Sequence, residues 1–360
     1  MSLESSAAVG PPPGMDVRLS SNESPFGPSP AAVAAASDAL ASAHLYPDDQ
    51  QVALRQAIAT HEDLPVEQVA VGNGSAALLM DAVAHAADPG DEVLAYERAF
   101  IVYRLAARNA DSHYVEVATD GPATGTSDGY GRTVEQLLAA VTDRTRVVCI
   151  DNPGNPTGAH LTGEELGELV AALPESITIV VDEAYHHFAA GQRGYATVAE
   201  LGLDHPRLLT MRTFSKAYAL AGLRVGYVTG PAELIGPLDA RRPRFNTTAT
   251  GQAAAVAALG DEDHLERTVT GTLEGRSTMA QGLRELGIPF TDGLGNFLTI
   301  ELGTEAGPVV AAYGERGIGV RSLPPYGMLE QIRVTVGTPD EVDAFLAASR
   351  EVLDGIPTRH

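Results

Sequence analysis

The sequence has little cysteine and no long apolar run. One cysteine, Cys149, occurs in 360 residues, which excludes a disulfide framework and a zinc site built on cysteines. Cys149 lies in an apolar run at 147–150, so we expect a buried small hydrophobic side chain. No stretch approaches the roughly 18 apolar residues of a membrane span. Residues 1–15 lack the features of a secretion signal. We therefore expect a cytoplasmic protein with a flexible start.

Basic residues are scarce relative to acidic ones. The chain has 47 Asp and Glu against 24 Lys and Arg, a formal net charge of -23. Such a charge repels nucleic acid and anionic lipid, which excludes both as expected partners. An anionic small molecule would need arginines placed locally around it.

An alternation of short apolar runs with Ala- and Leu-rich segments predicts an α/β fold with a mostly parallel sheet flanked by helices. The expected strands are at 68–71, 92–95, 113–117, 146–150, 177–181, 207–211 and 225–229, and the expected helices at 76–87, 100–109 and 163–172. A Gly/Thr/Ser-rich piece at 120–131 predicts a mobile surface loop.

The pattern changes after about residue 243. A helix-like stretch at 251–287 precedes short strands at 297–301 and 332–336 and a closing helix at 340–353. This predicts a large domain at 41–243 and a smaller α+β domain at 244–360.

Lys216 lies between two predicted strands, in the sequence Thr213-Phe214-Ser215-Lys216-Ala217. Small and apolar neighbours desolvate an amine, which lowers its pKa and favours nucleophilic attack on a carbonyl. A purely structural buried lysine is the alternative. Arg224, eight residues later, offers a planar fork for a phosphate.

Polar residues follow two other predicted strands. Asp182 follows the strand at 177–181, at the sheet edge where open α/β folds bind ligands. The string Asn-Pro-Gly-Asn-Pro-Thr-Gly at 152–158 follows the strand at 146–150. A loop-capping aspartate and an ordinary Pro/Gly turn are the alternatives.

A Gly-x-Gly-x-x-Ala spacing begins at Gly72 and lies between a predicted strand and a predicted helix. The same spacing occurs in dinucleotide-binding proteins, so a nicotinamide dehydrogenase is an alternative. In a dehydrogenase, as in any other protein that binds a phosphorylated cofactor at such a turn, backbone N–H groups at the start of the helix bind a phosphate. The dehydrogenase alternative leaves Lys216, Asp182 and Asn155 unexplained.

The motif Ser215-Lys216 with Ala221-Gly222-Leu223-Arg224 resembles the cofactor-lysine motif of fold-type I aminotransferases that use pyridoxal 5'-phosphate (PLP). It is most similar to the branch of histidinol-phosphate and aromatic amino acid aminotransferases. The similarity extends from Leu19-Ser20-Ser21-Asn22-Glu23 to Arg333-Val334-Thr335-Val336-Gly337. The resemblance implies transfer of an amino group between a small anionic amine or amino acid and a 2-oxo acid.

The resemblance also implies how the cofactor is held. Lys216 would bind PLP covalently, Asp182 would keep the pyridine nitrogen protonated, and Tyr185 and Asn155 would face the phenolic oxygen. Phe100 would stack on the ring. The residues expected around the phosphate are Gly74, Ser75, Ala76, Ser215 and Arg224.

Substrate and partner residues are implied in the same way. Arg333 would bind the carboxylate or phosphate of the substrate, with Arg321 as a second candidate. Asn22 would lie over the substrate, because residues 1–40 fold back onto the site in this family. Tyr46 would reach the phosphate of a neighbouring subunit, which implies a homodimer.

Other functions stay open from the sequence. A PLP-dependent decarboxylase of a phosphorylated amino acid would use the same cofactor residues but release CO₂. An aminotransferase of a specialised biosynthetic pathway is a further alternative. A non-catalytic PLP-binding or regulatory module is also an alternative, although the acidic charge and the lack of a DNA-binding segment beside the enzyme-length core argue against it. His186 and His187 do not predict a metal site, because adjacent residues on a strand face opposite sides.

Overall fold

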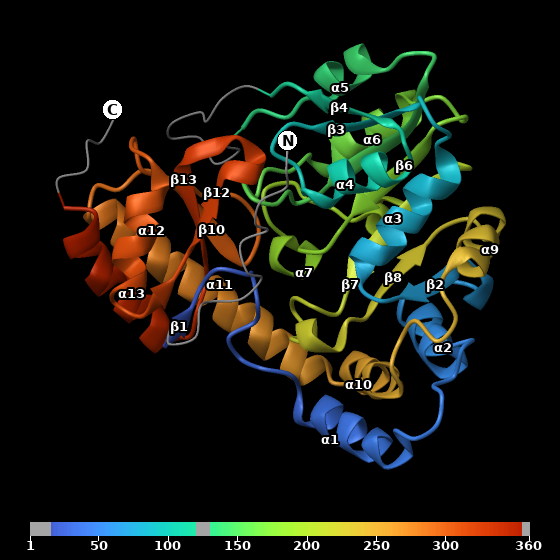
Figure 1. The fold of residues 1–360 in the computed structure, drawn as a ribbon, viewed down its shortest axis with the longest axis horizontal. Coiled ribbons are helices and arrows are strands. Elements are labelled where there is room, and N and C mark those ends of the chain that lie inside the picture. Colours follow the sequence, from blue (N-terminus) through green and yellow to red (C-terminus); the bar gives the residue numbers. More distant parts are fainter. Residues whose placement is uncertain (1–15, 120–129, 355–360) are drawn as a thin grey trace.

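The computed structural model describes residues 16–119 and 130–354 (Figure 1). The predicted flexible start at 1–15 and most of the predicted loop at 120–131 lie outside these residues. No helix in the described part of the chain combines the length and the hydrophobicity of a membrane span.

A seven-stranded sheet forms the larger part of the molecule, in the order β2-β8-β7-β6-β5-β3-β4. Its strands are β2 (Val69–Gly72), β3 (Glu92–Tyr96), β4 (His113–Val117), β5 (Thr145–Asp151), β6 (Thr178–Asp182), β7 (Leu208–Thr213) and β8 (Gly226–Thr229). Strands β4, β3, β5, β6 and β7 pair in parallel, whereas β8 runs antiparallel to both neighbours. The predicted mostly parallel sheet is confirmed.

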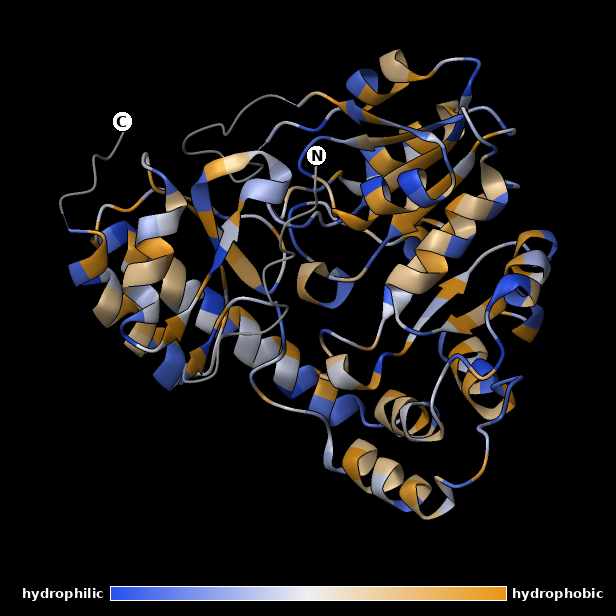
Figure 2. Cartoon of the chain, viewed as in Figure 1, coloured by the Kyte–Doolittle hydropathy of each residue, from blue (hydrophilic) through white to orange (hydrophobic). Residues whose placement is uncertain are grey.

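Helices bury both faces of this sheet, which explains why its inner strands are mostly apolar (Figure 2). Val93 and Ala95 contact the core under α3 (Ser75–Ala86), α4 (Val102–Asn109) and α9 (Ala232–Arg241), and Cys149 is buried there as expected. Leu94 and Tyr96 point the opposite way, toward α5 (Val134–Ala140), α6 (Gly163–Ala172) and α8 (Val198–Leu201). The alternation follows the two-residue period of a strand.

A second, antiparallel sheet has the order β12-β13-β10-β9. It consists of β9 (Phe290–Thr291), β10 (Phe297–Glu301), β12 (Arg321–Leu323) and β13 (Met328–Thr335), with η4 (Pro324–Tyr326) in the turn between β12 and β13. Its core is shared with α11 (Glu262–Glu285), α12 (Ala306–Gly314) and α13 (Pro339–Val352). The division of the chain into domains at residues 40 and 243 stays a prediction.

The helix predicted at 251–287 is two helices. The first, α10 (Ala249–Leu259), packs against α1 (Pro30–Ala39) and α2 (Val52–His61), two helices that the sequence analysis did not predict. The second, α11, begins after Asp261, whose side chain accepts a hydrogen bond from the His264 N–H and so caps a new N-terminus.

His186 and His187 begin a short helix, α7 (His186–Ala189), and the expectation that they lie on a strand is wrong. The chain leaves β6 at Asp182 and turns, so the two rings lie together, 3.8 Å between centroids. Burial lowers the pKa of both imidazoles, that of His187 to about 3, and the rings are neutral packing groups.

The N-terminal residues connect the two sheets. Strand β1 (Val17–Arg18) pairs in parallel with β11 (Ile318–Gly319), beside the smaller sheet. Residues 19–28, called the strap below, then run across to α1 (Figure 1). Leu19 is buried in the core of the smaller sheet and its carbonyl accepts a hydrogen bond from the Thr335 N–H at 2.8 Å. The strap is therefore anchored before it reaches the larger sheet.

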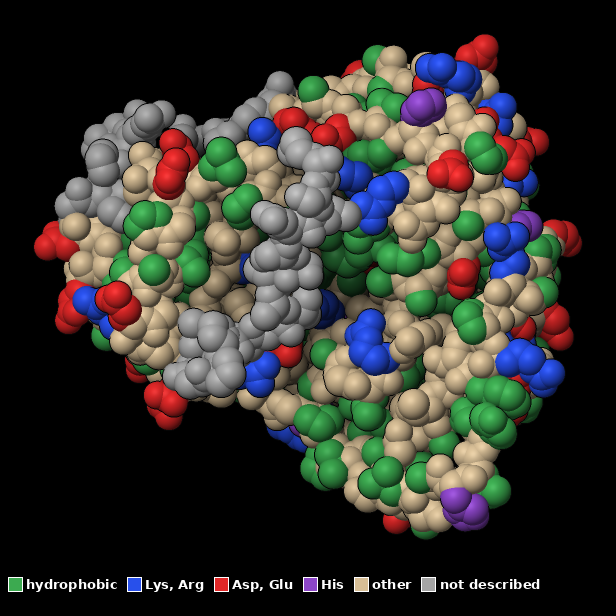
Figure 3. Space-filling model, in the orientation of Figure 1, with side chains coloured by type: hydrophobic (Ala, Val, Ile, Leu, Met, Phe, Trp, Pro, Cys, Tyr) green, Lys and Arg blue, Asp and Glu red, His purple; other side chains and the backbone are tan. Residues whose placement is uncertain are grey.

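Acidic side chains lie mainly around the rim of the face seen in Figure 3, whereas basic side chains occur at the rim and beside the hollow at its centre. On this face, the negative charge therefore lies mainly away from the central hollow.

Candidate active site

A cavity of about 600 Å³ lies between the strap, the carboxyl edge of the larger sheet and strands β12 and β13. It is lined by most of the residues predicted from the sequence: Asn22, Ser75, Ala76, Phe100, Asn155, Asp182, Tyr185, Ser215, Lys216, Arg224, Arg321 and Arg333. Positions far apart in the sequence therefore share one site, although their individual roles stay predictions.

Two aspartates mark the carboxyl edge of the sheet. Asp151 and Asp182 are register partners at the ends of β5 and β6. Asp151 also accepts hydrogen bonds at 3.0 Å from the backbone N–H groups of Phe100 and Asn155, and it forms an ion pair with Arg132 at 2.8 Å. It thereby fixes two predicted cofactor residues.

Asp182 is a buried carboxyl without a cationic partner at ion-pair distance among the described residues. Burial and, after it, the charge of the nearby Asp151 raise its pKa to about 7, while the Ala184 N–H donates to it at 3.1 Å and opposes that shift. A positively charged ring N–H placed beside this carboxyl would stabilise its ionised form. The environment of Asp182 therefore fits the protonated pyridine nitrogen of PLP.

Lys216 is the only lysine in the chain. Its Nζ atom donates to the Asn22 carbonyl at 3.1 Å, so the lysine lies against the strap. Burial and, after it, the charge of Arg333 lower its pKa to about 8, whereas the charge of Glu23 opposes the shift. A substantial share of the amine is consequently neutral near physiological pH, as proton transfer and attack on an aldehyde require.

Tyr185 contacts the same part of the strap. The Asn22 side-chain amide donates to the Tyr185 hydroxyl at 2.9 Å, and burial raises the pKa of Tyr185. The Asn22 N–H in turn donates to the Thr335 hydroxyl at 2.9 Å, and the Asn296 amide donates to the Asn22 carbonyl at 3.2 Å. These bonds hold Asn22 over the site.

The first turn of α3 forms one end of the cavity. Gly74 precedes this helix with a φ of +81° and provides no side-chain cap, so the first N–H groups remain available for an anion. A Cβ atom at Gly74 would overlap the Arg224 guanidinium, and one at Gly226 would overlap the Ser75 N–H. Both glycines are needed for the close approach of these groups.

Side chains complete a phosphate-sized cradle at this end. Arg224, Ser215 and Thr213 line it, and Arg224 has no carboxylate at ion-pair distance among the described residues. The helix terminus, the hydroxyls and the guanidinium together suit a phosphate group. With the lysine and the buried carboxyl, the residues present fit PLP.

Two arginines form the opposite end. Arg333 is buried and donates to the Asn155 side-chain oxygen and, at 2.9 Å, to the Ser20 carbonyl, while its Nε atom has no partner. No carboxylate of the described residues pairs with it. Arg321 is its register partner on the adjacent strand, so both side chains lie on the same face of the smaller sheet.

Tyr46 lies outside this cavity. Its side chain is 82% exposed and stacks on Phe245, 4.6 Å between ring centroids. It does not contribute to the site of its own chain.

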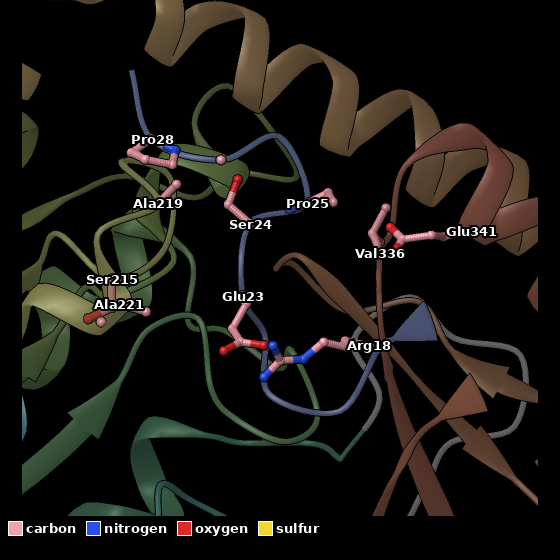
Figure 4. Close-up of a pocket in the computed structure, with 13 residues that line it drawn as sticks. Arg18, Glu23, Ser24, Pro25, Pro28, Ser215, Ala219, Ala221, Val336 and Glu341 are labelled. Carbon is pink, nitrogen blue, oxygen red and sulfur yellow. The ribbon is translucent and has the colours of Figure 1, made fainter. Parts of the chain in front are cut away.

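A second cavity of about 350 Å³ lies beside the first and shares Glu23, Ser215, Ala221 and Gly222 with it. The strap passes between the loop that carries Ser215 and Ala221 and the segment that carries Val336 and Glu341 (Figure 4). The strap therefore forms a wall of both cavities.

The sequence analysis missed several residues that line the main cavity. Asp151 ends a predicted strand just as Asp182 does, so the same reasoning could have found it. Thr213 was quoted in the lysine motif but given no role. Ile101 and Tyr326 carry no sequence signal, because only the approach of η4 to α4 brings them to the cavity.

The chain is similar to known aminotransferases over nearly its whole length. Residues 15–348 match the family model "Aminotransferase class I and II". Histidinol-phosphate aminotransferase 2 of Methylococcus capsulatus is 42% identical, over 94% of this chain and 90% of that protein. The aromatic amino acid aminotransferase of Rhodococcus jostii is 37% identical, over 92% and 88%.

A solved structure shows the same fold. The histidinol-phosphate aminotransferase of Sinorhizobium meliloti, in complex with pyridoxal 5'-phosphate, superposes with a TM-score of 0.86 at 28% identity, over 95% of this chain and 92% of that one. This likeness agrees with the fit of the cavity residues to the cofactor.

The first prediction concerns the acidity of Lys216. In PLP-free protein, we expect its labelling by acetic anhydride to rise with an apparent pKa of about 8, against about 10.4 for an unperturbed lysine. Because the chain has no other lysine, mass spectrometry of one peptide reports the rate, with the N-terminal amine as an internal reference. Glu23→Gln should lower the apparent pKa further. A midpoint near 10 would contradict the proposed environment.

The second prediction concerns the phosphate end. Gly74→Ala should weaken PLP binding at least about tenfold, because the new methyl group displaces Arg224 and charged hydrogen bonds are lost. Gly90→Ala is the matched control: Gly90 also has a positive φ, +91°, but nothing lies near its added methyl group. Titration of both variants with PLP, followed by absorbance, should show the loss in Gly74→Ala alone. Equal affinities would be evidence against this cradle.

Proposed function

Because the chain belongs to the class I and II aminotransferase family and is a PLP-dependent transaminase, we propose that its amino donor is histidinol phosphate and its acceptor a 2-oxo acid. The observation that carries this proposal is Arg333, a buried guanidinium with no acidic partner among the described residues. An uncompensated buried charge is costly, and an anionic substrate removes that cost.

Arg321, the register partner of Arg333, indicates which class of anion binds there. Arg321 lies directly across from Arg333, and like charges in register destabilise a sheet. Two guanidinium groups on one face suit the dianion of a phosphate ester, which offers three oxygens to their planar forks. This pairing supports a phosphorylated donor over one with a single carboxylate.

Other cavity residues act on the reacting atoms. Bound PLP supplies the carbonyl that receives the amino group and a ring that withdraws electrons from the carbon losing its proton. Asp182 would hold the proton on the ring nitrogen. Lys216, with its lowered pKa, would take the proton from the substrate carbon and return it one atom away. Tyr185 and Asn155 would position the phenolic oxygen.

An aromatic amino acid is a second candidate donor. The Rhodococcus relative carries that name, and the cavity wall includes the rings of Phe100 and Tyr326. The carboxylate of an aromatic amino acid would bind to Arg333 alone. The relatives reported above support transamination rather than decarboxylation of a phosphorylated amino acid.

The third prediction tests the donor. With 2-oxoglutarate as acceptor, kcat/KM should be highest for histidinol phosphate among histidinol phosphate, histidinol, phenylalanine, tyrosine and aspartate. Arg321→Gln should raise KM for histidinol phosphate about tenfold or more, because a charged hydrogen bond is lost, and should leave KM for phenylalanine unchanged. Arg316→Gln, on an exposed arginine paired with Glu351, is the control. A preference for phenylalanine would favour the second candidate.

We also propose that the active unit is a cytoplasmic homodimer in which Tyr46 reaches the cofactor phosphate of the partner. An exposed aromatic pair, Tyr46 and Phe245, supports this, together with the nearby exposed side chain of Leu45. Apolar side chains gathered on a surface are typical of an interface.

The fourth prediction tests this arrangement. Tyr46→Phe should weaken PLP binding several-fold although Tyr46 lies outside its own chain's cavity, since a hydroxyl that bonds a charged group is removed. Light scattering should give the mass of two chains. A monomer with unaltered PLP affinity in the variant would rule the arrangement out.

A further inference from the structure

We infer that Tyr326 contacts the substrate and determines specificity: its hydroxyl donates to the anionic group that Arg321 and Arg333 bind. The inference rests on the proposed function, because it assumes that this end of the cavity receives the phosphate of the donor. It adds a residue that neither the sequence motifs nor the comparisons single out.

One hairpin carries all three side chains. Arg321 lies on β12 and Arg333 on β13, and Tyr326 closes η4 in the turn between these strands. All three line the main cavity. A group bound by the two arginines therefore lies within the reach of the turn that joins their strands.

The charges around Tyr326 also point to an anion. Burial raises the pKa of its phenol, so the hydroxyl stays protonated and can donate, while Arg333 and Arg321 both act in the opposite direction. Two cations near a neutral phenol leave this corner of the cavity positive. An anion in this corner can receive a hydrogen bond from Tyr326 and charge from both arginines.

The hydroxyl proton is free for a ligand. The Ile101 N–H lies near the Tyr326 oxygen and acts to lower the pKa of its phenol. No acceptor among the described residues receives the Tyr326 hydroxyl, whereas the hydroxyls of Tyr313 and Tyr130 bond to side chains. Tyr326 thus has an unused donor at the cavity wall.

Packing contacts on the side away from the main cavity hold Tyr326 in position. Its ring packs against a cluster of Tyr130, Leu323 and Met328, and the Pro325 carbonyl accepts a hydrogen bond from Arg104 of α4 at 3.5 Å. Tyr326 also separates the main cavity from a small void lined by Arg104 and Tyr114. A donor held in place in this way loses little freedom when the anion binds.

The fifth prediction tests this role with two ligands. In the PLP-loaded enzyme, Tyr326→Phe should weaken the binding of inorganic phosphate about tenfold, measured by calorimetry. The bound cofactor occupies the other phosphate cradle, so the titration reports this end. The same variant should raise KM for histidinol phosphate by a similar factor with little change in kcat, and leave KM for phenylalanine unaltered.

Tyr114→Phe is the matched control, because Tyr114 lines the small void beside Tyr326 but not the main cavity. It should match wild type in every measurement. Unchanged phosphate affinity in Tyr326→Phe, or no phosphate binding by the wild type, would overturn the inference. Turnover of histidinol phosphate by the wild type would still uphold the proposed function in that case. If wild type binds phosphate through Tyr326 but transaminates only unphosphorylated donors, the proposed donor is wrong and the anion site remains.

Discussion

Parallel pairing of β5, β6 and β7 is the constraint on which the site depends. It places Asp151, Asp182 and Thr213 at one edge of the sheet, where Lys216 follows in the next turn. A shift of one residue would turn each side chain to the opposite face. An ion pair at 2.8 Å supports this register beside the site: Glu183, directly after β6, pairs with Arg212 of β7.

The strap forms the wall of the site opposite the edge of the larger sheet. Its carbonyl groups accept hydrogen bonds from two of the cationic side chains of the cavity, Lys216 at Asn22 and Arg333 at Ser20. Neutral acceptors satisfy these donors without cancelling their charge. Hence the strap orders the site while leaving its positive charge available for the cofactor and the substrate.

Much of this arrangement could be predicted from the sequence, since strand ends and motifs are local signals. The buried strands were found within a residue or two, and the residues after them share one cavity. Contacts between distant segments could not be read in the same way. Three features depend on packing partners that a local pattern does not contain. They are the break between helices at Gly260, the helix that begins at His186 and the approach of Tyr326 to Ile101.

The whole chain has a net negative charge, whereas the site is positively charged. Screening by salt explains how the two occur in one protein. At physiological ionic strength, charges more than about 8 Å apart in water interact weakly, so the acidic outer surface has little effect inside the cavity. The positive charges of Arg224 and Arg333 stay uncompensated there, because no carboxylate of the described residues pairs with either. An anionic cofactor and an anionic substrate can therefore bind at opposite ends of one cavity in a protein of net charge -23. The distance between the two arginine sites, rather than the overall charge, then determines which molecules fit.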